Sequence, residues 1–372
     1  MNIQQNPYNA SRPISRRNDF FGRKGEFRRA YQMLLSVESI NIIGSRRIGK
    51  TSFLNVLSNQ EMQQNFLEDV ETFRQRSLFV FLDMQSQKMA TPFEFLSRLA
   101  EQISAGGGNF HPQIQSYYDF EKILAQLANE DKQLFIVLDE FESVASNEHF
   151  TVAFYDMLRH YQQRYFVSYV VASAKGVKEV AKSAVTSSEF FNIFRVLRVG
   201  LLNDEDANDL ICKDASLAVD VPFVKLIAGR HPFFISLLCF HLFDAQAYEA
   251  DTPPGKSRER IIHRFLEEAF DHFVYAWDHL SSNERDVLKR IANNEKIDDD
   301  DTPELLSLEQ KALLAEQKGK HVIFSSAFEG FVKELEFSKT KEEVSQFISK
   351  NTRAIVSIGK YCIDQAVTAL KK

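Results

Sequence analysis

The sequence predicts an α/β fold in which a parallel sheet carries helices on both faces and is followed by smaller helical segments. Three observations predict it. Strand-like and helix-like segments alternate up to about residue 200, the strand-like runs are rich in apolar residues, and a glycine-containing loop joins the first run to a helix. Beyond residue 200 consecutive helices follow, so the 372 residues are expected to form two or three domains.

Five short apolar runs are the strand candidates of the first domain, which is predicted to span residues 1–200. Residues 134–138 are apolar at every position, as in a strand that is buried on both faces of a sheet. Residues 106–108, three consecutive glycines, mark a loop between two of them. The runs are residues 39–43, 78–83, 134–139, 166–173 and 194–199.

The rest of the chain divides into a small helical lid, a possible winged helix and a tail. Helices are expected over 203–215 and 222–243 within the lid, residues 201–250, and a Pro-Pro-Gly linker follows at 251–257. Residues 258–336 show helices at 281–292 and 305–315, a turn between short strands at 316–321 and a last helix at 326–335. Helices followed by a hairpin suggest a winged helix.

The tail, residues 337–372, is charged and amphipathic and is expected to be helical. Its apolar residues are candidate positions for contact with a partner. They are Val344, Phe347, Ile348, Val356, Ile363 and Val367.

Composition indicates a soluble, intracellular protein. Hydrophobic residues make up 44% and charged residues 26%, and a net charge of -6 argues against a chain that coats nucleic acid along its whole length. The three cysteines are far apart and show no metal-ligand spacing, which favours a reducing cytoplasm. The N-terminus lacks a signal-peptide core, and the longest apolar run, 233–243, is too short to span a bilayer.

The loop after the first strand matches the phosphate-binding pattern G-x-x-x-x-G-K-[ST]. Its backbone N–H groups can surround phosphate oxygens, Lys50 can reach the β- and γ-phosphates, and the Thr51 hydroxyl can bind Mg²⁺. Ser52 follows in a helix whose N-terminal dipole favours anions. The candidate loop residues are Gly44, Ser45, Arg46, Arg47, Ile48, Gly49, Lys50 and Thr51.

Hydrolysis also needs a metal ligand and a base, and the third apolar run ends in Asp139-Glu140. The carboxyl ends of parallel strands are where α/β proteins form ligand sites. Asp139 is expected to hold Mg²⁺, directly or through water, and Glu140 to orient and deprotonate the attacking water. Ser173 ends the next run, where it can contact the γ-phosphate or the water, although a plain strand-terminal serine is an equal interpretation.

These three elements resemble the additional-strand class of P-loop ATPases, and two further stretches resemble the STAND class of signal-transduction ATPases, which are related to AAA proteins. Asn6-Pro7-Tyr8 with Phe21-Gly22-Arg23 and Glu26 is similar to the family's "N-P-F … F-x-G-R-x-x-E" segment. Gly229-Arg230-His231-Pro232 is similar to the lid motif, with Arg230 in place of the frequent second glycine.

The resemblance, over about residues 6–335, implies an AAA-like sheet, a lid, a winged helix and a site for ATP or ADP with Mg²⁺. It also implies that Phe21, Gly22 and Arg23 pack around the adenine while His231 and Pro232 close over the base and ribose. Simpler interpretations stay open, since Phe21-Gly22 can be an ordinary turn and His231-Pro232 can simply start a helix.

The phosphate loop also contains Arg46 and Arg47, which can face solvent, a neighbouring subunit or the nucleotide. An arginine finger from a second protomer is a further possibility. Arg159 and Arg164 are its positional candidates, although ordinary surface solvation is the better interpretation of each.

Three functions compete. The leading hypothesis is a slow ATPase switch for signalling, with defence among its conceivable roles. It would be locked by ADP and driven by ATP into rearrangement or oligomerisation, through contacts of the winged helix or tail with another copy or a partner protein. STAND proteins usually carry a large sensor after the winged helix, and here only about one helical tail follows.

The alternative is a DNA-acting AAA-type ATPase, such as a transposition helper or loader. Its winged helix would enter the major groove and its basic N-terminus would contact phosphates. The acidic run at residues 298–301 argues against it, because it lies in the module that would meet DNA. A scaffold that binds nucleotide without hydrolysing it is the third hypothesis, and Glu140 argues against it.

Overall fold

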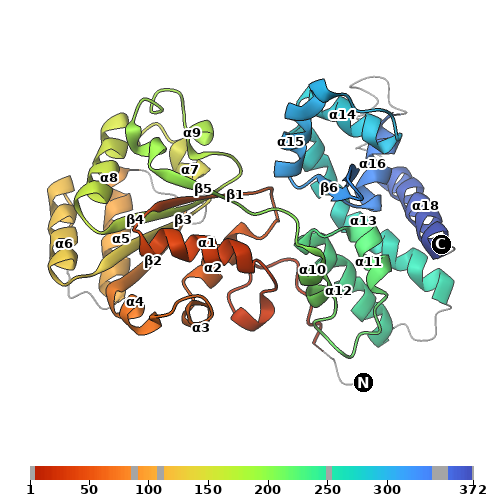
Figure 1. Ribbon diagram of the computed structural model, residues 1–372, viewed down its shortest axis with the longest axis horizontal. Helices are drawn as coiled ribbons and strands as arrows, with labels where there is room; N and C mark the ends of the chain where they lie inside the picture. The colour runs from red at the N-terminus through yellow and green to blue at the C-terminus, as the bar shows by residue number, and fades with distance from the viewer. Residues whose placement is uncertain (1–4, 85–90, 107–112, 249–253, 337–350, 371–372) are drawn as a thin grey trace. The chain divides into compact units, whose positions relative to one another are not determined.

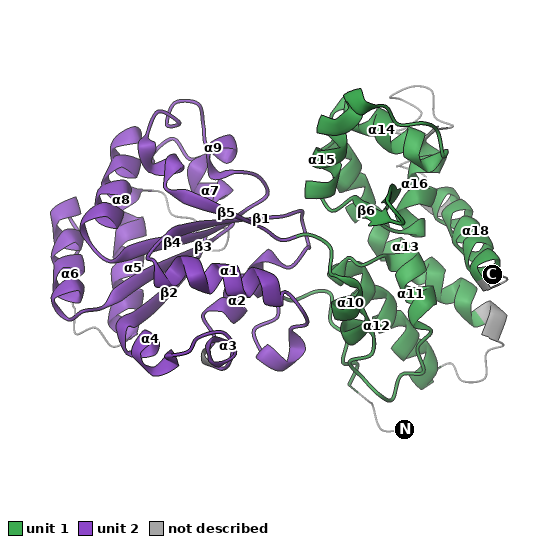
Figure 2. Cartoon of the chain, viewed as in Figure 1, with its two compact units in different colours: residues 1–12, 200–372 green, residues 13–199 purple. Residues whose placement is uncertain are grey.

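The computed structural model describes residues 5–84, 91–106, 113–248, 254–336 and 351–370, which form two compact units (Figures 1 and 2). The nucleotide-loop unit is Pro13–Val199. The helical unit combines the described residues up to Arg12 with those from Gly200 onward. The division at Val199 coincides with the boundary that the sequence predicted near residue 200.

A five-stranded parallel sheet organises the nucleotide-loop unit, in the order β2-β3-β4-β1-β5. Every predicted strand is confirmed to within one residue at each end. Because β4 lies between β1 and β3, the strand that precedes the glycine loop is separated from the strand that ends in Asp139 by an additional strand, as the resemblance implied. The strands are β1 (Ser39–Ile43), β2 (Ser77–Asp83), β3 (Gln133–Asp139), β4 (Val167–Ser173) and β5 (Phe194–Arg198).

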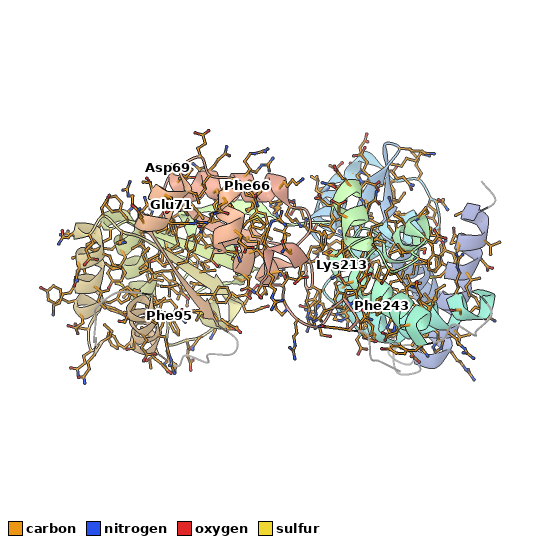
Figure 3. The ribbon with its side chains drawn as sticks, turned by 90° about the horizontal axis from the view of Figure 1, so that it is seen from below. Phe66, Asp69, Glu71, Phe95, Lys213 and Phe243 are labelled. Atoms are coloured by element: carbon orange, nitrogen blue, oxygen red, sulfur yellow. The ribbon has the colours of Figure 1, made fainter. Side chains whose placement is uncertain are left out.

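Helices cover both faces of this sheet. Successive side chains of a strand point to opposite faces, and those of β1, β3 and β4 are buried at nearly every position. The two faces can be followed from Phe66, which stacks on Tyr31, and from Phe95, which packs against Phe154 (Figure 3). The helices are α1 (Lys24–Leu35), α2 (Lys50–Leu57), α3 (Gln60–Gln64), α4 (Val70–Arg76), α5 (Pro92–Ala105), α6 (Tyr117–Asn129), α7 (Glu142–Ala145), α8 (Val152–Arg164) and α9 (Val177–Val180).

Strand parity decides which side chains face α2, the helix that follows the glycine loop. Leu134, Ile136 and Leu138 of β3 belong to the core that includes α5, α6 and α8. The intervening Phe135 stacks on Phe73 of α4, on the opposite face. Asp139 is four residues after Phe135, so its side chain points to the same face of the sheet. This is the face that α2 covers, where the predicted phosphate-binding residues lie.

Among the described residues, the helical unit contains eight α-helices, the short 3-10 helix Asp299–Asp301 and one antiparallel hairpin. The lid and the segments after it belong to this one unit, so the finer boundaries at 201–250, 258–336 and 337–372 stay predictions. The elements are α10 (Asp204–Ile211), α11 (Val221–Ala228), α12 (Pro232–Tyr248), α13 (Pro254–Asp278), α14 (Ser282–Ala292), α15 (Thr302–Gln310), β6 (Leu314–Gln317), β7 (Lys320–Ile323), α16 (Ser326–Glu336) and α18 (Asn351–Leu370).

The stretch 222–243, which the sequence suggested as one helical segment, is two helices separated at Gly229. This glycine has φ +65°, and a Cβ there would lie 2.1 Å from the carbonyl oxygen of Phe324. Only glycine fits, because the chain needs both the left-handed conformation and the close approach to the end of the hairpin. Likewise α13 begins at Pro254, within the predicted linker, because proline fits the first turn of a helix. Glycines 107 and 108 and residues 251–253 lie outside the described residues.

The N-terminal segment packs on the helical unit rather than on the sheet, although the sequence assigned residues 1–200 to a single domain. The Asn6 amide donates to the Phe240 carbonyl at 3.0 Å and to Asp244 at 2.8 Å. Tyr8 is 1% exposed and its hydroxyl donates to the Ile211 carbonyl at 2.6 Å. Lys213, labelled in Figure 3, lies 4.9 Å from the centre of the Tyr8 ring. These contacts explain the difference, because they tie the segment to α10 and α12.

The hairpin β6–β7 packs with α14, α15 and α16, which are the elements expected of a winged helix. Glu284 is buried here and accepts hydrogen bonds from Lys311 at 2.5 Å and Ser307 at 2.6 Å. The winged-helix interpretation itself stays a prediction. In the described ranges, no helix combines the length and apolar character needed to cross a membrane.

Candidate active site

The glycine loop curls tightly between β1 and α2. Gly44 leaves no room for a side chain, since a Cβ there would lie 2.5 Å from the carbonyl oxygen of Val199 and 2.8 Å from a methyl carbon of Ile48. Gly49 has φ +103°, which L side chains rarely adopt. Ile48 is buried beneath the loop, while Arg46 and Arg47 are exposed. The two glycines of the predicted pattern are therefore required for different reasons, one steric and one conformational.

Lys50 is the first residue of α2, and its ammonium group folds back over the loop. Its Nζ donates to the carbonyl oxygens of Gly44 at 2.9 Å and Ser45 at 3.2 Å. Burial lowers the pKa of Lys50, and the negative charges of Glu140, Glu142 and Asp139 oppose that shift. A positive charge is thus held at the rim of the loop, where phosphate oxygens would meet it.

Asp139 and Thr51 meet across the interface between β3 and α2. Asp139 is 4% exposed, and burial raises its pKa, although a hydrogen bond from Thr51 acts in the opposite direction. The two predicted metal ligands are therefore adjacent in the structure. A buried carboxylate and a hydroxyl are oxygen donors of the kind that Mg²⁺ prefers.

Glu140 follows in a strained turn and is exposed. Its φ is +52°, which is uncommon for a residue other than glycine, and its amide donates to the Asp139 carboxylate at 3.1 Å. Because backbone strain of this kind gathers at functional sites, the turn supports the predicted role of Glu140. Its carboxylate is available to solvent at the same sheet edge as Lys50.

Ser173 is engaged within the protein itself. Its hydroxyl donates to the Lys175 carbonyl at 2.5 Å and accepts a hydrogen bond from the Asn41 amide at 2.7 Å. Asn41 in turn accepts from the amide of Val177 at 3.1 Å. These contacts fasten the end of β4 to β1, and the predicted catalytic role of Ser173 stays a prediction.

Arg23 contacts the glycine loop through the backbone carbonyl of Ile48. It is 4% exposed, it follows Gly22, whose φ is +75°, and its guanidinium donates to the Ile48 carbonyl at 3.4 Å. Phe21 is partly exposed, because the neighbouring Phe20 fills the core against Phe27. Gly22 thus turns the chain so that Arg23 reaches the loop, and contact of Phe21 with adenine stays a prediction.

The remaining predicted residues are described within their own surroundings. His231 is 5% exposed and sits beside Phe234, and Pro232 starts α12, as the simpler interpretation had it. Both belong to the helical unit, and their predicted contact with base and ribose stays a prediction. Arg164 lies 3.9 Å from Glu121 and is largely exposed, which fits surface solvation.

The residues present fit a nucleoside phosphate with Mg²⁺. The Ser45 hydroxyl oxygen is shielded from solvent and has no hydrogen-bond partner among the described residues, so a phosphate oxygen would satisfy it. Lys50 supplies the adjacent positive charge, and Thr51 with Asp139 supplies oxygen ligands. Loop, cation and metal ligands therefore converge on one sheet edge.

Sequence reasoning missed Glu142, whose negative charge acts on Lys50, and Asn41, which organises the end of β4. Asn41 carried a signal, because it is a polar residue between the isoleucines at positions 40 and 42, at the centre of a buried strand. Glu142 carried none, since an acid three residues after Asp139 is ordinary in a loop.

Comparisons with solved structures show the same fold. A Walker-type ATPase from Pyrococcus abyssi is 14% identical, with a TM-score of 0.56 over 87% of this chain and 98% of that one. The ORC2 protein of Aeropyrum pernix, solved in complexes with ADPNP and ADP, is 14% identical, with a TM-score of 0.56 over 92% of this chain and 96% of that one. The search of curated proteins found no match.

A family model supplies the assignment that these distant structural matches do not. The model described as Novel STAND NTPase 2 matches residues 29–297, which is well over half of the chain and includes the glycine loop, Asp139 and the lid helices. With its phosphate loop, acid pair and additional-strand sheet, the chain belongs to the Novel STAND NTPase 2 family of P-loop NTPases.

Proposed function

We propose that the protein is an ATP-hydrolysing molecular switch, resting with ADP bound and rearranging or oligomerising when ATP replaces it. The family assignment supports nucleoside triphosphate hydrolysis. The resemblance of the Phe21-Gly22-Arg23 segment favours adenine, and the similarly folded ORC2 protein of Aeropyrum pernix was solved with ADPNP and ADP.

Each residue of the site has a place in this reaction. The loop amides and Lys50 would bind the β- and γ-phosphates, and Thr51 and Asp139 would hold Mg²⁺. The metal would neutralise charge that develops on the phosphate oxygens. Glu140 would accept a proton from water as its oxygen attacks the γ-phosphorus, and the bond to the β-phosphate oxygen breaks to leave ADP and phosphate.

The observation that carries the switch is that both connections between the two units are anchored beside the phosphate loop. On one connection, the amide of Ile14 donates to the Ser52 hydroxyl at 3.0 Å, directly after Thr51. On the other, the amide of Val199 donates to the Ile43 carbonyl at 2.8 Å, directly before Gly44. Loop rearrangement upon nucleotide exchange would thus pull on both connections at once.

The test uses the full chain and the variant Glu140→Gln, with the exposed Glu148→Gln as control. Purified wild-type protein is expected to retain ADP. Glu140→Gln is expected to keep ATP and to shift the oligomeric state in light scattering, because the glutamine keeps the side-chain shape but cannot accept the proton. Protein that holds no nucleotide and does not change its assembly would contradict the switch.

The tail offers limited surface for a partner, because one side of α18 is used internally. Ala354, Ile358 and Cys362 are buried, and α18 packs on α13 and α16. Val356 and Val367, at 43% and 44% exposed, are the predicted contact positions that stay on the outside. Val344, Phe347 and Ile348 lie outside the described residues. We propose that a second copy or a partner protein binds through the winged helix or this outer side, in the cytoplasm.

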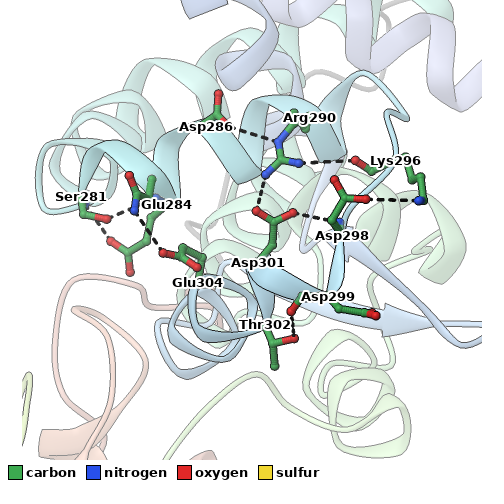
Figure 4. A network of polar contacts seen from close by, with 11 residues as sticks. Ser281, Glu284, Asp286, Arg290, Lys296, Asp298, Asp299, Asp301, Thr302 and Glu304 are labelled. Atoms are coloured by element: carbon green, nitrogen blue, oxygen red, sulfur yellow. Dashed lines mark hydrogen bonds and ion pairs between the residues drawn. The ribbon is translucent and has the colours of Figure 1, made fainter.

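Binding of DNA through the winged helix is supported less well. The helix that precedes the hairpin in the predicted module, α15, contains Glu304 and Glu309 but neither lysine nor arginine. In the network of Figure 4, Arg290 pairs with Asp286 and Asp301, and Lys296 pairs with Asp298. The nearby positive charges are therefore partly neutralised.

One observation favours DNA, namely the exposed pair Lys318 and Lys320 at the hairpin turn. Duplex binding measured at several salt concentrations decides this question. Binding whose salt dependence weakens in the double variant Lys318→Ala/Lys320→Ala, or on removal of the N-terminal arginines, would favour the DNA-acting ATPase.

A further inference from the structure

Glu142 is a third carboxylate at the edge of the sheet, and neither the phosphate-loop chemistry nor the Asp139–Glu140 pair uses it. It is the first residue of α7, two residues after Glu140. One carboxylate oxygen, Oε1, accepts a hydrogen bond from the backbone amide of Ala174 at 2.5 Å. The other oxygen, Oε2, is shielded from solvent without a hydrogen-bond partner in the described part of the chain.

This contact is one of two that join the turn after β3 to the end of β4. Phe141 is 1% exposed, and its amide donates to the Ala172 carbonyl at 3.3 Å. Glu142, the next residue, adds the second link, to Ala174, which lies two residues beyond Ala172. The strained residue Glu140 therefore precedes a segment that is held at two points on the neighbouring strand.

The link matters because a left-handed residue other than glycine persists only where its surroundings hold it. The φ of Glu140 is +52°, and its side chain is exposed, so side-chain packing does not fix the turn on the solvent side. Glu140 itself is held by its amide, which donates to Asp139 at 3.1 Å, and by its carbonyl, which accepts from the Ser143 amide at 3.0 Å. The contacts of Phe141 and Glu142 add the restraint toward β4, so loss of the Glu142 contact removes one of the bonds that hold the turn in place.

Glu142 has a second connection to the site through its charge. Burial lowers the pKa of Lys50, and the carboxylate of Glu142 is among the charges that oppose this shift. Glu142 thus borders both the base-bearing turn and the phosphate-binding lysine. Charge and hydrogen bonding predict different outcomes for the glutamine variant, because glutamine keeps an oxygen acceptor but loses the charge.

We propose that Glu142 is a positioning residue for hydrolysis, which accepts the Ala174 amide and so fixes the turn that presents Glu140 to the attacking water. This inference rests on the proposed role of Glu140 as the base. Glu142 fixes the turn through the hydrogen bond that its side chain accepts, so glutamine, an uncharged acceptor of the same length, should fix it as well. Nucleotide affinity depends on the loop and Lys50 and is not the property that Glu142 controls.

The test compares Glu142→Ala, Glu142→Gln and the exposed Glu148→Ala in the full chain, with kcat and KM for MgATP measured beside the Kd for ADP. Glu142→Ala is expected to lower kcat roughly 10- to 100-fold, as misplacing a catalytic group does, while the Kd for ADP changes about twofold or less. Glu142→Gln is expected to restore kcat to within about threefold of the wild type.

Hydrogen exchange supplies a readout that does not depend on turnover. Peptides that cover residues 172–176 should lose protection in Glu142→Ala and keep it in Glu142→Gln, because only the latter can accept the Ala174 amide. If the alanine variant does not fold, Glu142→Asp replaces it. Its shorter side chain keeps the charge but should not reach the Ala174 amide, so both kcat and the protection at Ala174 should fall while Glu142→Gln matches the wild type.

Two results would overturn the inference while leaving the switch intact. One is a Glu142→Ala variant with unchanged kcat, and the other is a Glu142→Gln variant as slow as the alanine variant, which would assign the effect to charge. A wild-type protein that binds ATP without turning it over would instead contradict the proposed hydrolysis, and the inference with it.

Discussion

The amide of Ile14 donates a hydrogen bond to the Ser52 hydroxyl at 3.0 Å, which ties the connection from the helical unit to the first turn of α2. Asn55 adds a second, longer bond from its amide to the Ile14 carbonyl at 3.4 Å. The same helix begins with Lys50 and Thr51, which directly precede Ser52. A nucleotide that reorders this first turn would therefore also move the hydrogen bond between Ser52 and Ile14.

Replacing Ser52 by alanine is expected to loosen residues 13–17 and to weaken the protection that ADP gives them. Loss of one hydrogen bond costs about 0.5–1.5 kcal/mol, which corresponds to roughly 2- to 10-fold faster local opening. Trypsin cleavage at the exposed Arg16, followed by mass spectrometry with and without ADP, measures this. Ser58→Ala is the control, because that hydroxyl bonds the Asn55 carbonyl at the other end of α2. Equal cleavage rates in all three proteins would exclude coupling through Ser52.

Gly44→Ala is expected to destabilise the nucleotide-loop unit by about 1–3 kcal/mol and to abolish ADP binding, since the new methyl group would overlap the Val199 carbonyl and Ile48. Gly25→Ala is a matched control, because a Cβ at that position of α1 meets nothing within 4 Å. Chemical unfolding followed by circular dichroism gives the stability, and calorimetry gives the ADP affinity. A Gly44→Ala protein that binds ADP like the wild type would contradict the steric argument.

Much of the first unit could be predicted from sequence, for physical reasons that particular residues show. The run from Leu134 to Leu138 is apolar at every position, because both faces of β3 are covered, and such a run has few alternative structures. The loop from Gly44 to Thr51 is equally restrictive, since it needs two glycines at fixed spacing and a lysine and hydroxyl directly after them.

Contacts between distant segments could not be predicted in the same way. The hydrogen bonds of Tyr8 to Ile211 and of Glu142 to Ala174 join residues whose local sequence is unremarkable, and only the assembled fold brings them together. The break at Gly229 was hidden for the same reason, because its cause is the approach of Phe324. The local sequence pattern indicates helices, strands and positions that need glycine. It does not indicate which residues distant in the sequence come into contact in the folded chain.

Glu284→Gln is expected to destabilise the helical unit at neutral pH. Burial alone would raise the pKa of Glu284, but hydrogen bonds from Lys311, Ser307 and the Ser281 amide outweigh it and lower the pKa below its ordinary value of 4.5. Stability from the ionised carboxylate is therefore present above pH 4.5 and is lost as the pH falls through the lower folded-state pKa.

The single tryptophan, Trp277 of α13, is 4% exposed and reports unfolding of this unit alone. Urea titrations followed by its fluorescence should show a loss of about 1–3 kcal/mol for Glu284→Gln near pH 7 that shrinks below pH 4.5. Glu295→Gln, at an exposed position, should follow the wild type at every pH. A difference that stays constant with pH would mean that the charge of Glu284 does not contribute.

Lys50→Ala is expected to abolish binding of both ADP and ATP, because its ammonium group is the positive charge that the structure holds against the phosphate loop. The variant should still fold, since among the described residues the Lys50 ammonium group donates only to the loop carbonyls of Gly44 and Ser45, and its desolvation cost is removed together with it. Lys122→Ala, which removes an exposed lysine paired with Asp119 on α6, controls for the loss of one positive charge. Calorimetric titration with ADP, in the presence and absence of Mg²⁺, gives the affinities. If Lys50→Ala and Lys122→Ala both bind ADP as tightly as the wild type, the nucleotide binds elsewhere than at this loop.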